Sequence, residues 1–138
     1  MAGPNVFWDT NVLIDFLLER SPYSVDANAM FDMAHGRKIS LATSETAITT
    51  AIYVCRGTRV AEALLVFLNY AVVVPADQHA IRNALASPFK GKEDAILYHL
   101  ALHHKMDAFI TRDKKDFTRY ASPLLPVLTP KEFMKQQQ

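Results

Sequence analysis

The sequence predicts an α/β fold in which a parallel sheet of four to five strands lies between two layers of helices. Runs of β-prone residues alternate with stretches of helical periodicity, a pattern typical of a parallel sheet covered on both faces. The chain has 138 residues, of which 50% are hydrophobic, so residues 1–138 are expected to form a single domain with its own core. Acidic residues stand at the ends of predicted strands and the starts of predicted helices. We therefore expect a three-layer α/β/α domain with its polar chemistry at one edge of the sheet.

The first part of the chain predicts one strand and two helices. The aromatic and apolar run at residues 6–8 is typical of a buried strand. Apolar residues recur at helical spacing over residues 12–18, with Asp15 on another, polar face. The hydroxyl of Ser21, followed by a proline, is a helix-start signal, and the helix predicted over residues 21–35 ends at a glycine.

The middle of the chain predicts two strands separated by two helices. Residues 39–43 are β-prone and lead directly into a helix over residues 45–56, which a serine is placed to cap. Thr58 is placed to cap the next helix, which keeps an apolar face as far as Asn69. Residues 70–74 form an unbroken β-prone run and are predicted to be the third strand.

The last part of the chain predicts a helix pair, a fourth strand and a short edge strand. Residues 77–86 are predicted to be helical, and after a basic loop a second helix is predicted over residues 93–105. The fourth strand is predicted over residues 108–111, and residues 124–128 are expected to form a short, proline-interrupted edge strand. A Thr-Pro pair at Pro130 begins the final helix.

Carboxylates cluster where the predicted strands end. Asp9 follows the first strand and Asp113 follows the fourth, and parallel strands with right-handed crossovers end at one edge of a sheet. If the second and third strands lie on one side of the first and the fourth lies on the other, the two acids flank the reversal of strand order, where open α/β sheets bind ligands. Glu45 and Asp94 begin helices, where the helix dipole favours a carboxylate even without a function. Oxygen ligands of this kind point to Mg²⁺ or Mn²⁺ rather than zinc.

The chain resembles the PIN (PilT N-terminus) domain family in segments that occur in the family's order. They are Asp-Thr-Asn-Val-Leu-Ile-Asp at residues 9–15, Glu-Asp-Ala-Ile at 93–96, Thr-Arg-Asp-Lys-Lys-Asp-Phe at 111–117 and Pro-Val-Leu-Thr-Pro-Lys-Glu-Phe at 126–133. The order and spacing of these segments carry the resemblance more than any one of them does. Together they cover essentially the whole chain.

The resemblance implies a ribonuclease that uses Mg²⁺ or Mn²⁺ to activate water for the cleavage of single-stranded or looped RNA. Many such proteins are the toxin of a toxin–antitoxin pair, as VapC-like toxins are, so an antitoxin protein is an implied partner. The family pattern assigns catalysis and metal binding to Asp9, Asp94 and Asp113. It assigns supporting hydrogen bonds to Asn11 and Thr111. Basic residues near these acids are expected to offset phosphate charge on the RNA: Lys90, Lys92, Arg112, Lys114 and Lys115.

One position departs from the family pattern. Many members carry a second acid about six residues beyond the serine that opens the helix after the second strand, and counting from Ser44 leads to Thr50. Glu45 begins the same helix more than one turn away, and Glu93 begins the later helix. Either of them completes the site, or the site is one carboxylate short. Asp116 is a further candidate acid, with a solvated turn residue as the equal alternative.

The departure at Thr50 keeps a second hypothesis open. In this hypothesis the chain is a non-catalytic PIN-fold module that binds nucleic acid or protein through a degenerate acidic site. The nuclease requires Mg²⁺ or Mn²⁺ to cleave RNA, whereas the binding module associates with its partner whether or not the metal is present.

Other classes of site find less support in the sequence. His99 and His103 are one helical turn apart, but no Glu follows His99 as in a zinc protease and no third ligand is evident. Asp9 does not fit a phosphatase of the haloacid dehalogenase type, because Asn11 stands where the second acid is needed. Cys55 is the only cysteine and lies in an apolar helical stretch, so we expect a structural role and no intrachain disulfide.

Location and assembly follow from the same composition. No stretch approaches the roughly 18 apolar residues of a membrane span. The N-terminus lacks the basic segment followed by an apolar run that is typical of a signal peptide. With the single cysteine, these features fit a reducing cytoplasm. The helices predicted over residues 21–35 and 45–69 are rich in apolar side chains, Met30, Phe31 and Met33 among them. One core of this size is not expected to hide them all, so we expect a two-fold homodimer.

Overall fold

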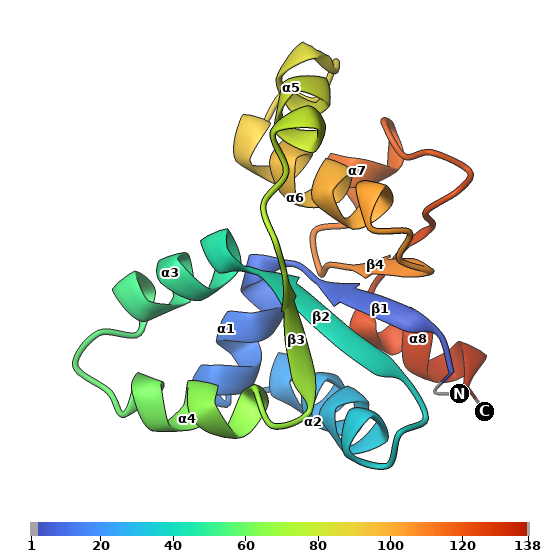
Figure 1. Ribbon diagram of the computed structural model, residues 1–138. Coiled ribbons are helices and arrows are strands. Elements are labelled where there is room, and N and C mark those ends of the chain that lie inside the picture. The colour runs from blue at the N-terminus through green and yellow to red at the C-terminus, as the bar shows by residue number, and fades with distance from the viewer. Residues whose placement is uncertain (1–2, 138) are drawn as a thin grey trace.

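The computed structural model describes residues 3–137, and the ends of the predicted domain, residues 1–2 and 138, lie outside the described residues. The strands are β1 Asn5–Trp8, β2 Ser40–Ser44, β3 Ala71–Val74, β4 Ala108–Ile110 and β5 Val127–Leu128. The helices are α1 Thr10–Leu18, α2 Tyr23–His35, α3 Glu45–Val54, α4 Val60–Phe67, α5 Gln78–Ala86, α6 Lys92–His103, α7 Lys115–Thr118 and α8 Pro130–Gln136. All strands are parallel, in the order β3-β2-β1-β4-β5 (Figure 1). The predicted three-layer fold is therefore confirmed, and the strand order meets the condition under which Asp9 and Asp113 flank a reversal beside β1.

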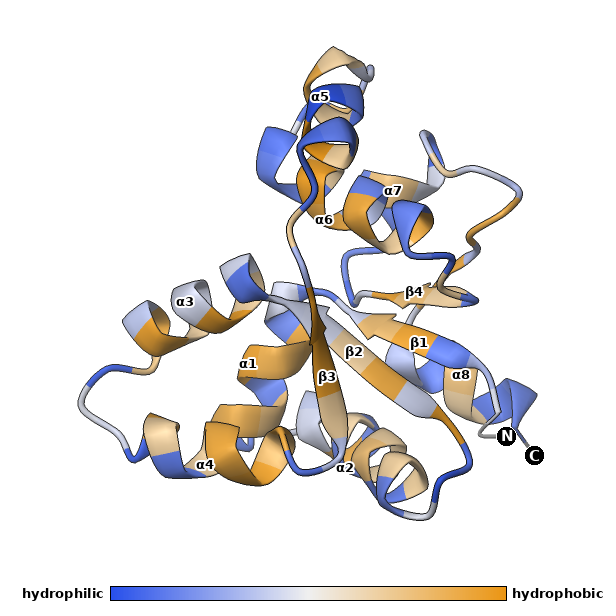
Figure 2. Ribbon diagram, in the orientation of Figure 1, coloured by the Kyte–Doolittle hydropathy of each residue, from blue (hydrophilic) through white to orange (hydrophobic). Residues whose placement is uncertain are grey.

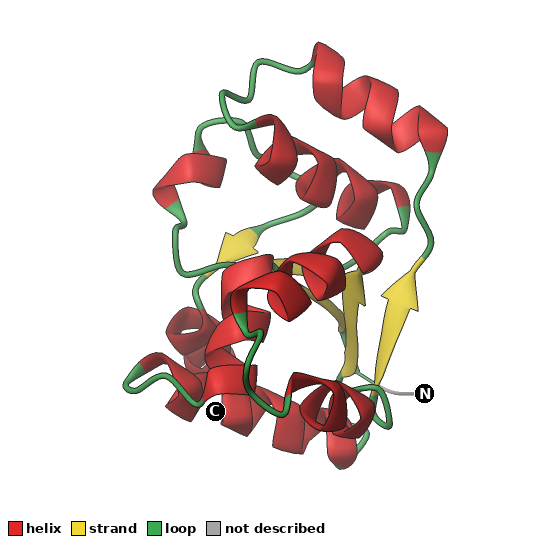
Figure 3. Cartoon of the chain, turned by 90° about the vertical axis from the view of Figure 1, so that its left-hand side faces the viewer, coloured by secondary structure: helices red, strands yellow, loops and turns green. Residues whose placement is uncertain are grey.

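The central strand β1 shows how one short sequence builds both layers. Successive side chains of a strand point to opposite faces, and Val6 and Trp8 join one hydrophobic core while Phe7 joins the other. The first core is formed with α1, α2, α3, α4 and α8, and the second with α5, α6 and α7. Figures 1 and 3 show these two groups of helices on opposite sides of the sheet. An apolar strand buried on both faces is what the aromatic run at residues 6–8 predicts.

Several predicted boundaries differ from the structure for local reasons. Ser21 does not cap α2: Pro22 is the N-cap residue, no side chain caps the helix, and the Ser24 N–H donates to the Arg20 carbonyl at 2.8 Å. Thr58 does not cap α4, because its hydroxyl donates to the Cys55 carbonyl and completes the turn after α3. The predicted edge strand is shorter than expected, and the single-turn helix α7 was not predicted. A four-residue helix is too short to show a helical period.

The apolar side chains of the helices are distributed differently from the sequence expectation. Met30 is fully buried, and Phe31 and Met33 pack against the first core, so these residues are not surplus to the core. Exposed apolar side chains lie instead on α3 and α4, most clearly at Tyr53 and Leu65. Figure 2 shows the hydrophobic colour of α4 at the outside of the molecule and of β3 at the edge of the sheet.

Candidate active site

Asp9 lies at the junction of β1 and α1, where both its backbone and its side chain are held. Its N–H donates to the Ile110 carbonyl of β4 at 2.9 Å, and the residue is the N-cap of α1. Its Oδ1 accepts a hydrogen bond from the Thr10 N–H at 2.8 Å, and its Oδ2 accepts one from the Thr111 hydroxyl at 2.8 Å. Only 4% of Asp9 is exposed, so the carboxylate has a fixed position at the sheet edge.

The surroundings of Asp9 oppose its negative charge. Burial is the main reason that the pKa of Asp9 is raised from 3.8 to about 6, and the charges of Asp94 and Asp113 raise it as well. The hydrogen bonds from Thr111 and Thr10 lower it and limit the rise. The negative charges of Asp94 and Asp113 therefore act on a carboxylate that is already desolvated. A cation bound beside Asp9 offsets both the desolvation and the repulsion.

Asp94 enters the same region from the first turn of α6. Burial raises the pKa of this half-buried carboxyl, and so do the charges of Asp116, Asp113 and Glu93. The N-cap residue of α6 is Gly91, and a Cβ placed there would lie 3.2 Å from Oδ2 of Asp94. The missing side chain of Gly91 thus leaves room for the Asp94 carboxylate above the start of the helix.

Asp113 is connected to Asp9 through two polar side chains. Its Oδ2 accepts a hydrogen bond from Nδ2 of Asn11 at 3.2 Å, and its N–H donates to the hydroxyl of Thr111 at 3.1 Å. The same hydroxyl donates to Asp9, so Thr111 connects the backbone of one acid with the side chain of the other. Asn11 and Thr111, expected as supporting residues, make these contacts. Asp113 itself is exposed.

A cavity of about 230 Å³ lies between α1, α3 and α6 at this edge of the sheet. Asp9, Asn11 and Asp94 line it, and Thr46 and Thr50 line it from α3. Thr50, the residue that stands where the family pattern has an acid, therefore shares this cavity with the two carboxylates. Glu93 also lines the cavity, whereas Glu45 is exposed and is not among the lining residues. Asp116 borders a neighbouring cavity.

The residues around Asp9 suit a divalent cation by their chemistry. The candidate ligands offer carboxylate, amide and hydroxyl oxygens, which Mg²⁺ and Mn²⁺ prefer. Within residues 3–137, no group of three or more His, Cys, Asp or Glu side chains is arranged to hold a metal ion. Mg²⁺ is commonly held by one or two carboxylates, with waters and substrate phosphates as further ligands. Asp9 and Asp94, on one cavity, meet that smaller requirement.

Of the five basic residues expected to contact RNA, three are held by other groups of the protein, and within residues 3–137 the other two have no such partner. Lys92 donates to the Ser87 carbonyl at 2.7 Å, and Lys114 pairs with Glu132 of α8 at 3.0 Å. The remaining three are Arg112, Lys90 and Lys115. Arg112 pairs with a buried acid, as described next, whereas Lys90 and Lys115 line a cavity of about 360 Å³ that also reaches Asp94.

Asp15 is a buried acid that sequence reasoning placed on the polar face of its helix. Its side chain is 3% exposed, and its Oδ1 lies 2.7 Å from Nη2 of Arg20 while its Oδ2 lies 3.4 Å from Nε of Arg112. Arg112 also lies over the ring of Tyr23, 4.2 Å from its centroid. Burial raises the pKa of Asp15, and the charges of Arg112 and Arg20 lower it. Arg112 thus ties the segment between Thr111 and Asp113 to α1.

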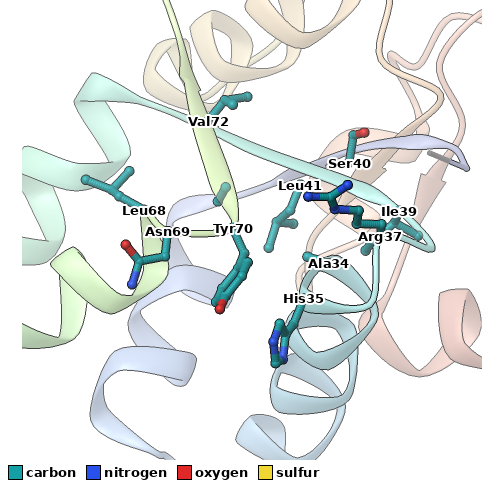
Figure 4. Close-up of a pocket in the computed structure, with 11 residues that line it drawn as sticks. Ala34, His35, Arg37, Ile39, Ser40, Leu41, Leu68, Asn69, Tyr70 and Val72 are labelled. Carbon is teal, nitrogen blue, oxygen red and sulfur yellow. The ribbon is translucent and has the colours of Figure 1, made fainter. Parts of the chain in front are cut away.

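A further and larger cavity lies away from these acids. A cavity of about 960 Å³ lies where β2 and β3 begin, at the opposite edge of the sheet, and Figure 4 shows its lining side chains. His35, Arg37 and Tyr70 are its largest polar members, and no carboxylate lines it. Because a hard cation needs oxygen anions, this cavity is not the predicted metal site.

Other residues considered in the sequence have packing roles. His99 lies against Phe89, with ring centroids 6.1 Å apart, and His103 lies 3.5 Å from Asp77. Cys55 is buried, and burial raises the pKa of its thiol, which fits a structural cysteine. Among residues 3–137 no helix has the length and apolar character needed to cross a membrane.

Comparisons with known proteins agree with the fold and with the sequence resemblance. The family model described as PIN domain matches residues 5–115, and no curated protein sequence matches the chain. A toxin–antitoxin complex from Klebsiella pneumoniae has a similar chain, with a TM-score of 0.70, 23% identity, and coverage of 91% of this chain and 97% of that chain. VapBC2 from Rickettsia felis, bound to a DNA fragment from its promoter, gives a TM-score of 0.66 at 13% identity, covering 91% and 98%. FitAB bound to an IR36 DNA fragment gives 0.61 at 16% identity, covering 91% and 94%.

Proposed function

Because the chain belongs to the PIN domain family, we propose that it is a Mg²⁺- or Mn²⁺-dependent endoribonuclease that cleaves single-stranded or looped RNA. The observation that carries this proposal is the buried Asp9 carboxylate, which lines one cavity with Asp94 and whose pKa is raised mainly by burial and further by the charges of Asp94 and Asp113. Unstacked RNA segments enter such a cavity more readily than a duplex does. The arrangement favours a ligand that brings positive charge to the acids.

The roles of the chain's own residues follow from their contacts. Asp9 and Asp94 are the carboxylates that would hold a divalent cation, which when bound lowers the pKa of water and polarises a phosphate. The hydrogen bonds from Thr10 and Thr111 keep Asp9 in one orientation. Asn11 holds the carboxylate of Asp113 beside this pair. A fixed set of acids reduces the reorganisation that a reaction at the phosphate requires.

The first experiment tests the reaction and its metal dependence. The protein is incubated with a labelled single-stranded RNA, the same RNA as a duplex, and a single-stranded DNA, with Mg²⁺, Mn²⁺ or a chelator. Cleavage of the single-stranded RNA that needs the metal supports the proposal. If neither metal supports cleavage, and RNA binds equally well with and without the metals, the result supports the non-catalytic binding module.

Thr50 is the observation that keeps the binding module as a second candidate. Its place in the cavity leaves the site with a hydroxyl where a third inward carboxylate was expected. Fewer anionic ligands weaken the affinity for a divalent cation. A site that binds metal too weakly at cellular concentration does not cleave RNA but retains its basic surface.

Thr50→Glu is expected to strengthen metal binding while it destabilises the metal-free protein. The new carboxylate faces Asp9 and Asp94, so like charges repel until a cation is bound. The melting temperature without metal is expected to fall, and its increase on adding Mn²⁺ is expected to exceed that of the wild type. Thr49→Glu is the matched control, because Thr49 is exposed and does not line the cavity. If both variants respond to Mn²⁺ alike, Thr50 does not occupy a ligand position.

We further propose that the chain is the toxin of a toxin–antitoxin pair, present in the reducing cytoplasm. The support is the similarity to the chain from the Klebsiella pneumoniae toxin–antitoxin complex, together with the family. Expression of the chain alone is then expected to arrest bacterial growth. Co-expression of a neighbouring small DNA-binding protein is expected to restore growth, and normal growth in both cases would contradict the toxin role.

The chain is also expected to form a homodimer through the exposed apolar side chains of α3 and α4. Tyr53 and Leu65 are 66% and 68% exposed, and their sequence neighbours Ile52, Val54 and Val66 are exposed as well, so these apolar side chains are not isolated surface positions. Sedimentation velocity at micromolar concentration is expected to show a dimer for the wild type and a monomer for Tyr53→Glu/Leu65→Glu. The matched control is Val25→Glu/Leu124→Glu, whose positions are 66% and 81% exposed. A monomeric wild type contradicts this prediction.

A further inference from the structure

A second cavity adjoins the candidate active site, and Asp94 is the side chain that borders both. This cavity of about 360 Å³ is lined by Lys90, Lys115 and Arg119, by Tyr120, and by the acids Asp94 and Asp116. Its volume falls within the range of roughly 300–1,000 Å³ that is usual for small-molecule sites. The residues come from the loop before α6 and from the segment around α7, far apart in the sequence. The fold has therefore gathered cations and an aromatic ring directly beside the acids.

The cations of this cavity differ from the other basic residues near the acids. Within residues 3–137, Lys90, Lys115 and Arg119 have no carboxylate within 4.0 Å, whereas Lys114 and Arg112 are paired with Glu132 and Asp15. Lys92 is occupied by the Ser87 carbonyl. Unpaired cations are the ones that can release counterions and bind a phosphate without first losing a partner.

The remaining walls of the cavity suit a nucleotide as well. Tyr120 is half-buried and packs against Phe89 with ring centroids 4.8 Å apart, and the guanidinium carbon of Arg119 lies 5.7 Å from the Tyr120 centroid. A fixed aromatic ring is a platform on which a base can stack whatever its sequence. Gly91, the N-cap residue of α6, also lines this cavity, and no side chain caps the helix. Its free N–H groups add positive potential for a phosphate.

We propose that this cavity binds the nucleotide next to the cleaved phosphate of a single-stranded RNA, with its phosphate against Lys90, Lys115 and Arg119 and its base on Tyr120. The proposal rests on the proposed ribonuclease function and specifies where the RNA strand leaves the acids. Asp94 and Asp116 repel a phosphate at the border of the cavity, so a divalent cation at the acids strengthens RNA binding here. The strand therefore runs from the cavity at Asp9, past Asp94, toward α7.

The test measures binding of a fluorescent single-stranded oligoribonucleotide by anisotropy over a series of salt concentrations, with Ca²⁺ or with a chelator. Each phosphate contact to a single strand contributes about 0.7 to the slope of log K against log salt, and the cavity is proposed to hold one phosphate, so Lys115→Gln/Arg119→Gln is expected to reduce the slope by up to about 0.7. Its Kd is expected to rise roughly tenfold. Lys90→Gln, on a different segment, leaves the other two cations in place and is expected to reduce the slope by less than about 0.7. Tyr120→Leu is expected to weaken binding fivefold or more, and Tyr120→Phe to leave it unchanged.

The control variant Arg37→Gln/Lys135→Gln also removes one Arg and one Lys, but from residues that do not line this cavity. It is expected to keep the wild-type slope and Kd within twofold. If the wild type binds and cleaves RNA while the cavity variants match this control, the subsite is wrong and the ribonuclease proposal stands. If the wild type binds no single-stranded RNA with or without the cation, both proposals are wrong. Melting temperatures of all variants show whether a loss of binding is a loss of fold.

Discussion

Asp9→Asn is expected to abolish metal-dependent RNA cleavage and at the same time to increase stability at neutral pH. The carboxylate is the most buried of the candidate ligands, so its loss removes the ligand whose position is most fixed. The same burial makes its charge unfavourable in the folded protein without metal. A pKa raised from 3.8 to about 6 corresponds to roughly 3 kcal/mol of destabilisation by the ionised form. The amide has one oxygen to accept the two hydrogen bonds from Thr10 and Thr111, which reduces the net gain to about 1–2 kcal/mol.

The pH dependence gives this prediction a definite sign. Because the folded pKa of Asp9 lies above the unfolded value, its contribution favours the folded state below about pH 4 and is lost as the pH rises to about 6. Wild-type stability is therefore expected to include a decrease over this window that Asp9→Asn lacks. Urea unfolding at a series of pH values, without metal, measures the difference. Asp32→Asn is the control, since Asp32 is exposed on α2, away from the acids at the sheet edge.

Metal binding provides the second measurement on the same variant. The melting temperature of the wild type is expected to rise with Mg²⁺ or Mn²⁺, because a ligand that binds only the folded state stabilises it. Asp9→Asn is expected to lose most of this rise. A variant that keeps the full rise would show that Asp9 is not a metal ligand, and one that loses more than about 1 kcal/mol of stability would contradict the account of its burial.

Arg112→Gln is expected to cost about 2–3 kcal/mol of stability at neutral pH, more than other arginine replacements on the surface. Arg112 compensates the buried carboxylate of Asp15 and lies over the ring of Tyr23. Without the guanidinium, Asp15 keeps its desolvation cost and has only Arg20 as a cationic partner. The glutamine also removes the cation–π contact, which contributes about 0.5–1 kcal/mol.

The pH profile and a matched variant test this origin. The pKa of Asp15, already raised by burial, is expected to rise further without Arg112, so the deficit is largest at neutral pH and becomes smaller as acid protonates the carboxyl. Arg59→Gln is the control, because Arg59 and Glu62 form an exposed pair expected to contribute less than about 1 kcal/mol. If the two variants lose equal free energy of unfolding, or if the loss for Arg112→Gln does not change with pH, the role given to Asp15 is wrong.

Arg112→Gln is also expected to reduce RNA cleavage by roughly tenfold, because small displacements of catalytic groups are costly. Arg112 stands between Thr111 and Asp113, and its contact with Asp15 holds this segment on α1. The salt dependence of RNA binding is expected to stay at the wild-type slope, since the guanidinium faces a carboxylate rather than the RNA. A lower slope would show that Arg112 contacts the RNA, as expected from the sequence.

Local patterns were sufficient for most of the fold. The alternation of apolar runs and helical periods predicted the strands and their parallel direction, because strands such as β1 and β4 are buried on both faces. The patterns failed where the decisive contact was a single hydrogen bond or a very short element. Thr58 has the chemistry of a cap but bonds to Cys55, and α7 is too short to show a period.

The sequence by itself determined which chemical groups are available: Asp9 after the first strand, Asp94 at a helix start, Asp113 after the fourth strand, and a group of lysines and arginines around them. These assignments depend on residues close together in the chain, and such local relations can be predicted from the spacing of apolar residues and from helix-capping residues. The tertiary structure alone decided that Thr50 lines one cavity with the acids, that Asp15 is buried, and that, within residues 3–137, Lys114 and Arg112 are paired while Lys115 is not. Each of these depends on contacts between distant elements, where the distance and desolvation of two side chains set their interaction, and no local spacing carries that information.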